Sequence, residues 1–158
     1  MNHTPTLHPA LRPLAPLVGV FTGDGAGDYP TIEAFTYREE VTFGHVGAPV
    51  LAYHQRTRSP DGAPMHAESG FLRMPAADRV EWTLAHSFGI VELLEGSWDG
   101  RTLELTSTSL VGSATAKDVG GTRRRYHLEG DVLRTDVWMS YAGYTDEHHL
   151  TSVLHREV

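Results

Sequence analysis

The chain has 158 residues, 40% of them hydrophobic and 21% charged, which is typical of one globular domain over residues 1–158. Thirteen basic residues against 20 acidic ones give a net charge of −7, which argues against nucleic acid as the main partner. Because the chain has no cysteine, disulfides, thiolate metal sites and cysteine nucleophiles are excluded.

The first residues carry four prolines, at positions 5, 9, 13 and 16, which rule out a long helix. Residues 1–8 are interpreted as a loose arm. Leu11, Leu14 and Leu17 are spaced to cover an apolar surface, so we expect a short helical turn over one end of the fold.

A glycine-rich stretch follows, from Gly19 to Ile32. In an extended chain alternate residues share a face, so glycines 19, 23, 25 and 27 leave one face of this predicted strand bare. A bare face suits the close approach of another backbone or a flat ligand, or a bend at a barrel corner without any ligand. Pro30 ends the pairing, because proline cannot donate to the ladder.

The remainder of the chain reads as successive short strands. Alternating patterns and turn signals predict strands over residues 35–43, 50–57, 65–74, 80–85, 90–98, from 103, 117–128 and 132–140. Residues 148–156 suit either a helix or a strand, and we favour a strand because a closing strand removes two sheet edges. The sequential hairpins favour an all-β, ten-stranded antiparallel up-and-down β-barrel of lipocalin-like type over a sandwich. A barrel of this size predicts a lumen with a cavity for an apolar small molecule.

The sequence shows neither a signal peptide nor a membrane-spanning run. Residues 1–6 lack the basic and apolar regions of a signal peptide, and no apolar run approaches the ~20 residues that span a bilayer. We therefore expect a cytoplasmic protein with no membrane partner.

Among the candidates for chemistry, His66 and Glu68 share a strand face and form a pair that can bind a metal ion. No third ligand is evident, and a single histidine is more often solvated or structural. The run 123–125 of three arginines resembles an anion site, but on a strand it splits between two faces, which favours a solvated exterior. Tryptophans 82, 98 and 138 are more typical of a core or an interface than of a ligand stack.

Several long motifs occur in order along the chain: Gly19–Ile32, Phe35–Glu40, Phe43–Gly47, Gly62–Gly70, Ala114–Val119 and His148–Leu150. In these motifs the chain resembles the nitrobindin family of ferric haem-binding β-barrels, from about Pro9 onward. The resemblance implies one ferric haem b per chain, peroxynitrite isomerisation to nitrate, and nitric oxide as a second small ligand. It leaves a homodimer open.

The resemblance also implies site residues. The histidine directly before the leucine of the closing segment, His149, would be the iron ligand and the catalytic residue. The other expected contacts to the cofactor are Thr31, Met65, His66, Met139, Gly19, Phe21, Gly23 and Gly25.

One position departs from the family motif Gly-x-Trp-x-Gly-x-Gly. Phe21 stands at the tryptophan position, which keeps an aromatic ring but loses the indole donor. Two alternatives to the enzyme remain at this point: a haem-based nitric oxide sensor or carrier without turnover, and a lipocalin-like barrel that binds an apolar molecule without metal.

Overall fold

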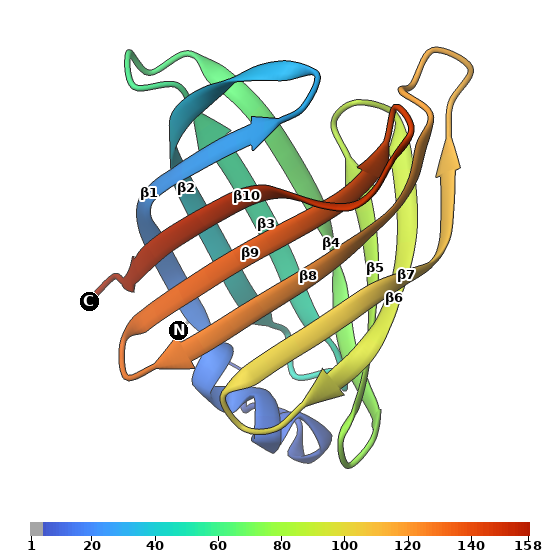
Figure 1. The fold of residues 1–158 in the computed structure, drawn as a ribbon. Coiled ribbons are helices and arrows are strands. Elements are labelled where there is room, and N and C mark those ends of the chain that lie inside the picture. The colour runs from blue at the N-terminus through green and yellow to red at the C-terminus, as the bar shows by residue number, and fades with distance from the viewer. Residues whose placement is uncertain (1–4) are drawn as a thin grey trace.

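The computed structural model describes residues 5–158 as one closed barrel of ten antiparallel strands with a short helix at one end (Figure 1). The elements are η1 (Pro9–Leu17), β1 (Gly19–Tyr29), β2 (Ile32–His45), β3 (Leu51–Arg58), β4 (Pro64–Ala76), β5 (Arg79–His86), β6 (Ile90–Trp98), β7 (Thr102–Gly112), β8 (Val119–Glu129), β9 (Val132–Tyr141) and β10 (Tyr144–Arg156).

Each strand pairs with its neighbour in the sequence, and β10 pairs with β1 to close the sheet. The alternation expected of a barrel is clearest in β3, where every second residue, beginning with Leu51, is buried. The predicted up-and-down barrel is therefore confirmed, and the closing segment is a strand that begins earlier than expected, at Tyr144.

Helix η1 plugs the lower end of the barrel in Figure 1. Leu11, Leu14 and Leu17 are fully buried in the core, and the indole nitrogen of Trp98 donates a 2.8 Å hydrogen bond to the carbonyl of Pro13. The prediction of a short helical cap is confirmed. Of the expected loose arm, residues 1–4 lie outside the described residues, residues 5 and 6 are exposed, and Leu7 packs against the core.

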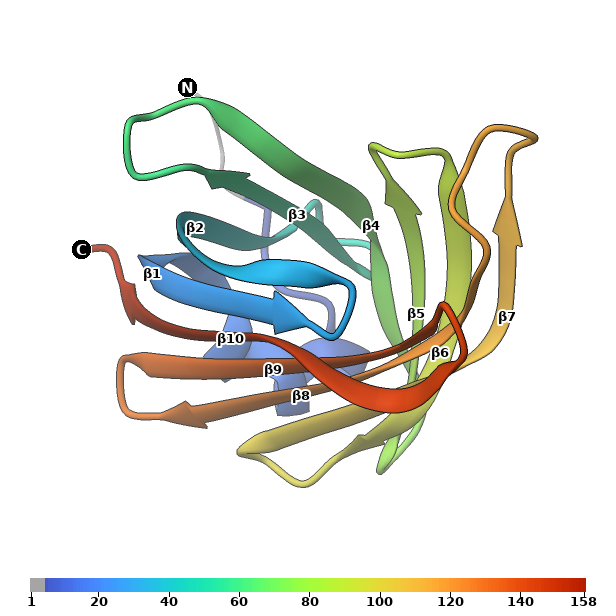
Figure 2. The same ribbon diagram turned by 45° about the horizontal axis from the view of Figure 1, so that its top comes forward.

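The interior has three layers along the barrel axis. The plugged end is apolar, with Phe43 and Trp82 among its largest buried side chains. The middle is crossed by a belt of buried polar side chains: Glu39, Gln55, Glu68, Glu92, Arg124, Thr135 and Ser152. The opposite end is the mouth, around which five hairpin connections lie and which no helix formed by residues 5–158 covers (Figure 2).

No helix among residues 5–158 has the length and apolar character needed to cross a bilayer.

Replacing Leu14 by alanine is expected to destabilise the protein by about 2–5 kcal/mol, because it opens a cavity between η1 and the barrel. Arg12→Ala on the exposed side of the same helix is the control and is expected to change stability by less than about 0.5 kcal/mol. Urea denaturation measures both. Equal midpoints for the two variants would show that η1 does not plug the barrel.

Candidate functional site at the barrel mouth

His149 lies on the inner side of the mouth because β10 is irregular there. His148 pairs with Trp138 and Leu150 pairs with Val137, so His149 is the extra residue of a β-bulge. Its ring lies 5.4 Å from the ring of Tyr29, nearly perpendicular to it. The ring of Phe35 lies 6.4 Å from it, also edge to face.

His148 takes the opposite direction. Its Nε2 lies 2.9 Å from a carboxylate oxygen of Asp136. Its ring packs edge to face with the ring of Trp138 on the exterior of β9. The bulge thus separates two adjacent histidines, one toward the mouth and one toward solvent.

The hydrogen bonding of His149 determines which ring nitrogen is free. Nδ1 lies 2.9 Å from the backbone carbonyl oxygen of Asp28, which only accepts, so Nδ1 must carry the hydrogen and donate it. The lone pair is then on Nε2. Burial lowers the pKa of His149 and outweighs the hydrogen bond to the Asp28 carbonyl, which raises it. The net lowering favours the neutral ring. A neutral imidazole held through one nitrogen by a carbonyl is the usual form of a metal-binding histidine.

A hollow of about 520 Å³ lies along the seam of β10, β1 and β2 and reaches His149. Its volume falls within the range of pockets for small molecules. Its lining residues come from both faces of the seam: Ala26, Gly27, Asp28, Ala34, Phe35, Thr36, His148, His149 and Thr151. The wide open lumen expected from the strand number is not seen at the plugged end and in the middle, where large side chains and the polar belt fill the interior.

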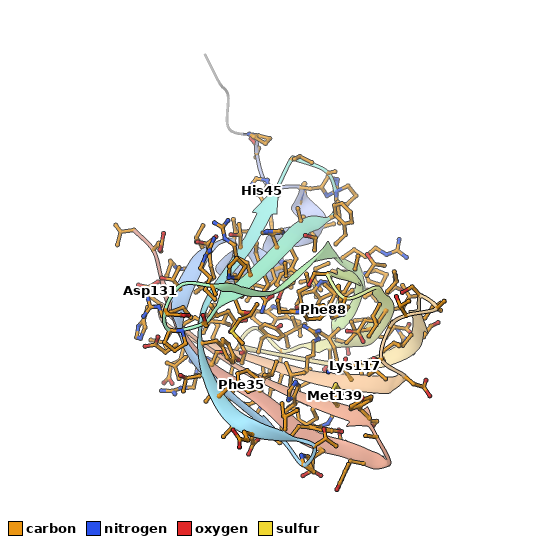
Figure 3. All side chains as sticks on the ribbon, turned by 90° about the horizontal axis from the view of Figure 1, so that it is seen from above. Phe35, His45, Phe88, Lys117, Asp131 and Met139 are labelled. Atoms are coloured by element: carbon orange, nitrogen blue, oxygen red, sulfur yellow. The ribbon has the colours of Figure 1, made fainter. Side chains whose placement is uncertain are left out.

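Several of the predicted contact residues do gather at the mouth. Thr31 lies in the exposed turn between β1 and β2, and Met65 and His66 begin β4 on the same rim. Met139 is half-buried on β9, and its carbonyl accepts a 2.9 Å hydrogen bond from the Tyr29 hydroxyl. Figure 3 looks onto this end and labels Phe35 and Met139.

The glycine face is not bare, which corrects the prediction of a surface for a flat ligand. A side chain at Gly25 would collide with the ring of Tyr37 and the hydroxyl of Ser152, and one at Gly23 would collide with the backbone of Val153. These glycines are needed because neighbouring strands and rings approach β1 closely. The structure thus favours the alternative without a ligand for this face.

Gly19 and Phe21 were also expected to contact the cofactor, but they lie at the plugged end, away from the mouth. Phe21 is fully buried in the core at the plugged end, with the guanidinium of Arg156 4.5 Å from its ring centroid. Gly19 approaches the same arginine side chain. Both lie at the start of β1, whereas His149 lies near the end of the barrel where β1 finishes. The replacement of the family tryptophan by Phe21 therefore concerns core packing.

Below the mouth, the buried guanidinium of Arg124 joins two buried carboxylates. It donates to both oxygens of Glu68, at 2.6 and 3.0 Å, and to Glu92 at 3.2 Å. The solvated exterior expected for the arginine run is correct for Arg123 and Arg125, which pair with exposed acidic residues, and wrong for Arg124.

His86 is the residue of this cluster that the sequence did not single out. It stands directly opposite Glu68 in the β4–β5 ladder, so both side chains enter the barrel together. Its Nδ1 lies 3.1 Å from Glu68 and its Nε2 2.9 Å from Glu92. Burial lowers the pKa of His86, but the hydrogen bonds to these two carboxylates outweigh it and raise the pKa to about 9.

The charge on His86 makes stability depend on pH. Because its pKa is about 9 in the folded protein, above the ordinary value of 6.5 for an unfolded chain, the stabilisation is complete below pH 6.5 and is lost as pH rises through 9. We expect a loss on the order of 3 kcal/mol in the free energy of unfolding across this range. Denaturant titrations between pH 6 and 10 test this, with His86→Gln as the control that lacks the pH-dependent loss. A parallel decline in both proteins would refute it.

The fold and the mouth define a class of protein: a closed antiparallel β-barrel whose open end presents a histidine with a free Nε2. The sequence profile described as the THAP4-like, heme-binding beta-barrel domain matches residues 10–156. The chain belongs to this family, which confirms the resemblance seen in the sequence.

Relatives of known name cover nearly the whole chain. A protein of Mycobacterium avium named peroxynitrite isomerase 2 is 48% identical over 156 residues, covering 96% of this chain and 97% of its own. A protein of Nocardia farcinica named peroxynitrite isomerase is 47% identical and covers 96% of this chain and 93% of its own. The crystal structure of Rv2717c from M. tuberculosis superposes with a TM-score of 0.91 at 43% identity, covering 97% of this chain and all of that one.

Proposed function

We propose that this protein binds one ferric haem b at the mouth of the barrel and isomerises peroxynitrite to nitrate there. The observation that carries the proposal is His149, whose Nδ1 is committed to the Asp28 carbonyl so that Nε2 is free to bind iron. The names of the mycobacterial and nocardial relatives support the choice of reaction.

The residues present fit a haem. His149 would hold the iron, and Thr31, Met65, His66 and Met139 would lie around the group at the rim. The bound group would supply a metal centre at which an anion or nitric oxide can bind.

The chain itself orients His149 and shields it. The bulge and the Asp28 carbonyl fix the direction of the ring, and the rings of Tyr29 and Phe35 pack against it, which limits access of water to the ligand. Tyr29 is in turn fixed by its hydroxyl, which donates to backbone carbonyls of Met139 and Tyr141. The imidazole therefore needs little reorganisation to bind iron.

The test is stopped-flow decay of peroxynitrite with the haemin-loaded ferric protein. We expect decay faster than in buffer, in proportion to the concentration of loaded protein, with nitrate as the product. The haem-free protein is the control and should leave the rate near that of buffer. If the loaded protein binds nitric oxide but leaves the decay of peroxynitrite unchanged, the isomerase proposal fails and a sensor or carrier is favoured.

A further inference from the structure

A second group of metal-binding side chains lies inside the barrel, apart from His149. His66, Glu68 and His86 each offer one ligand atom, and these atoms lie within 4.8 Å of one another. His66 and Glu68 are alternate residues of β4, and His86 faces Glu68 from β5, so a hairpin brings all three onto the inner face.

The three atoms form a nearly equilateral triangle. His86 Nδ1 lies 3.1 Å from Glu68 Oε2, His66 Nε2 lies 3.3 Å from the same oxygen, and the two nitrogens are 3.4 Å apart. Tetrahedral coordination with bonds of about 2.0–2.1 Å requires ligand atoms roughly 3.3 Å apart. The spacing therefore matches one face of a tetrahedral site without rearrangement.

The surrounding contacts are those that support a metal ligand. The other nitrogen of His86 contacts the carboxylate of Glu92 at 2.9 Å, an arrangement that orients metal-binding histidines. Glu92 is fixed in turn by the hydroxyls of Ser107 and Thr122, at 2.7 and 2.9 Å. Glu92 therefore fixes the ring of His86 through Nε2, the nitrogen that is not offered to the metal.

Glu68 is positioned by Arg124 and by the hydroxyl of Tyr53, which donates to Oε1 at 2.8 Å. Although Arg124 also touches Oε2, each carboxylate oxygen has two acceptor sites, so Oε2 can bind an ion as well. When the ion takes the place of the His86 proton, one guanidinium against the carboxylates of Glu68 and Glu92 leaves a net negative charge that favours a cation. His66 is 27% exposed, so an ion can enter from the mouth.

We propose that His66, Glu68 and His86 bind a divalent transition-metal ion such as Zn²⁺, with the fourth position open toward the mouth. Two histidines and one carboxylate are a common ligand set for zinc and for non-haem iron. His66 is also an expected contact of the haem in the proposed function, but none of the three residues is the expected iron ligand, and zinc binding is tested on the haem-free protein.

The test uses chelator-treated, haem-free protein titrated with Zn²⁺ by calorimetry. We expect one saturable site per chain. Loss of an outer partner of a metal ligand weakens binding about 10- to 100-fold, so loss of a direct ligand in His66→Ala or His86→Ala should weaken it by more than about 100-fold. His54→Ala, which alters a histidine on the outer face of β3, should bind Zn²⁺ as the unaltered chain does.

Co²⁺ provides a second readout, since a tetrahedral site gives it intense visible absorption. We expect these bands in the unaltered chain and their loss in His66→Ala, whose half-buried side chain can be removed without opening the core. Should His86→Ala fail to fold, His66→Ala and His66→Gln decide the matter. Absence of saturable binding, or binding that survives both His66 variants, would overturn the proposal.

Discussion

His149→Ala is expected to abolish haem retention, whereas His148→Ala is expected to leave it intact. The two histidines are adjacent, but the bulge in β10 directs only His149 toward Tyr29 and the mouth, while His148 is bound to Asp136 outside. Because loss of an outer partner of a metal ligand already costs about 10- to 100-fold in affinity, loss of the ligand itself should cost more than about 100-fold. Titration of each variant with haemin, followed by absorbance and then gel filtration, measures retention.

The pair of variants also tests the register of β10. Both side chains are partly or largely exposed, so neither replacement should unfold the barrel, and thermal melts of the haem-free proteins verify this. Equal loss of haem in both variants would mean that the bulge does not separate the two rings. Retention in His149→Ala with loss in His148→Ala would reverse the assignment.

Arg124→Leu is expected to destabilise the haem-free protein by about 3–5 kcal/mol. The guanidinium is buried and is the shared partner of Glu68 and Glu92, so its removal leaves two carboxylates in the interior with reduced compensation. Burial opposes the charge on Arg124, but its pKa is raised well above the ordinary value by these carboxylates and by Tyr126, so it is charged at every relevant pH. Urea denaturation at neutral pH measures the loss.

The next residue supplies the control. Arg125 lies on the outer face of β8, half exposed, and its 3.3 Å pair with Glu104 is solvated. Arg125→Leu should change stability by less than about 1 kcal/mol. Adding Glu68→Gln to Arg124→Leu should recover part of the lost stability, because one uncompensated charge is removed. If the two arginine variants unfold at the same urea concentration, the polar belt does not contribute as described.

The strand pattern of the sequence was sufficient for the barrel, because buried and exposed positions alternate along parts of many strands. In β3 the alternation beginning at Leu51 is unbroken, and the prolines and leucines of residues 9–17 anticipated the plug. The burial of Arg124 was not predictable in this way, since its partners come from two other strands and only the closed barrel brings them together.

Two β-bulges account for the site residues that alternation alone misplaces. Leu150 and Ser152 face inward, and the same alternation continued backward would turn His148 inward. The bulge instead directs His149 toward the mouth. In the β4–β5 hairpin, uninterrupted pairing from Ala76 and Arg79 would place Ser87 opposite Glu68. The bulge between Arg73 and Ala76 brings His86 there instead.

The glycine stretch shows a different limit of sequence analysis. Absence of side chains predicts that something approaches β1 closely, but it does not identify what approaches. At Gly25 and Gly27 the neighbours are the rings of Tyr37 and Phe35 together with side chains of β10. Their identity depends on strand register, which the glycines do not encode.

The central claim is that His149 holds the iron, and its most direct test is the iron–histidine stretching band in the resonance Raman spectrum of the reduced, haemin-reconstituted protein. The band should be present in the unaltered chain and in His148→Ala, and absent from any haem that His149→Ala still binds. Persistence of the same band in His149→Ala would contradict the claim, because another histidine would then be the ligand.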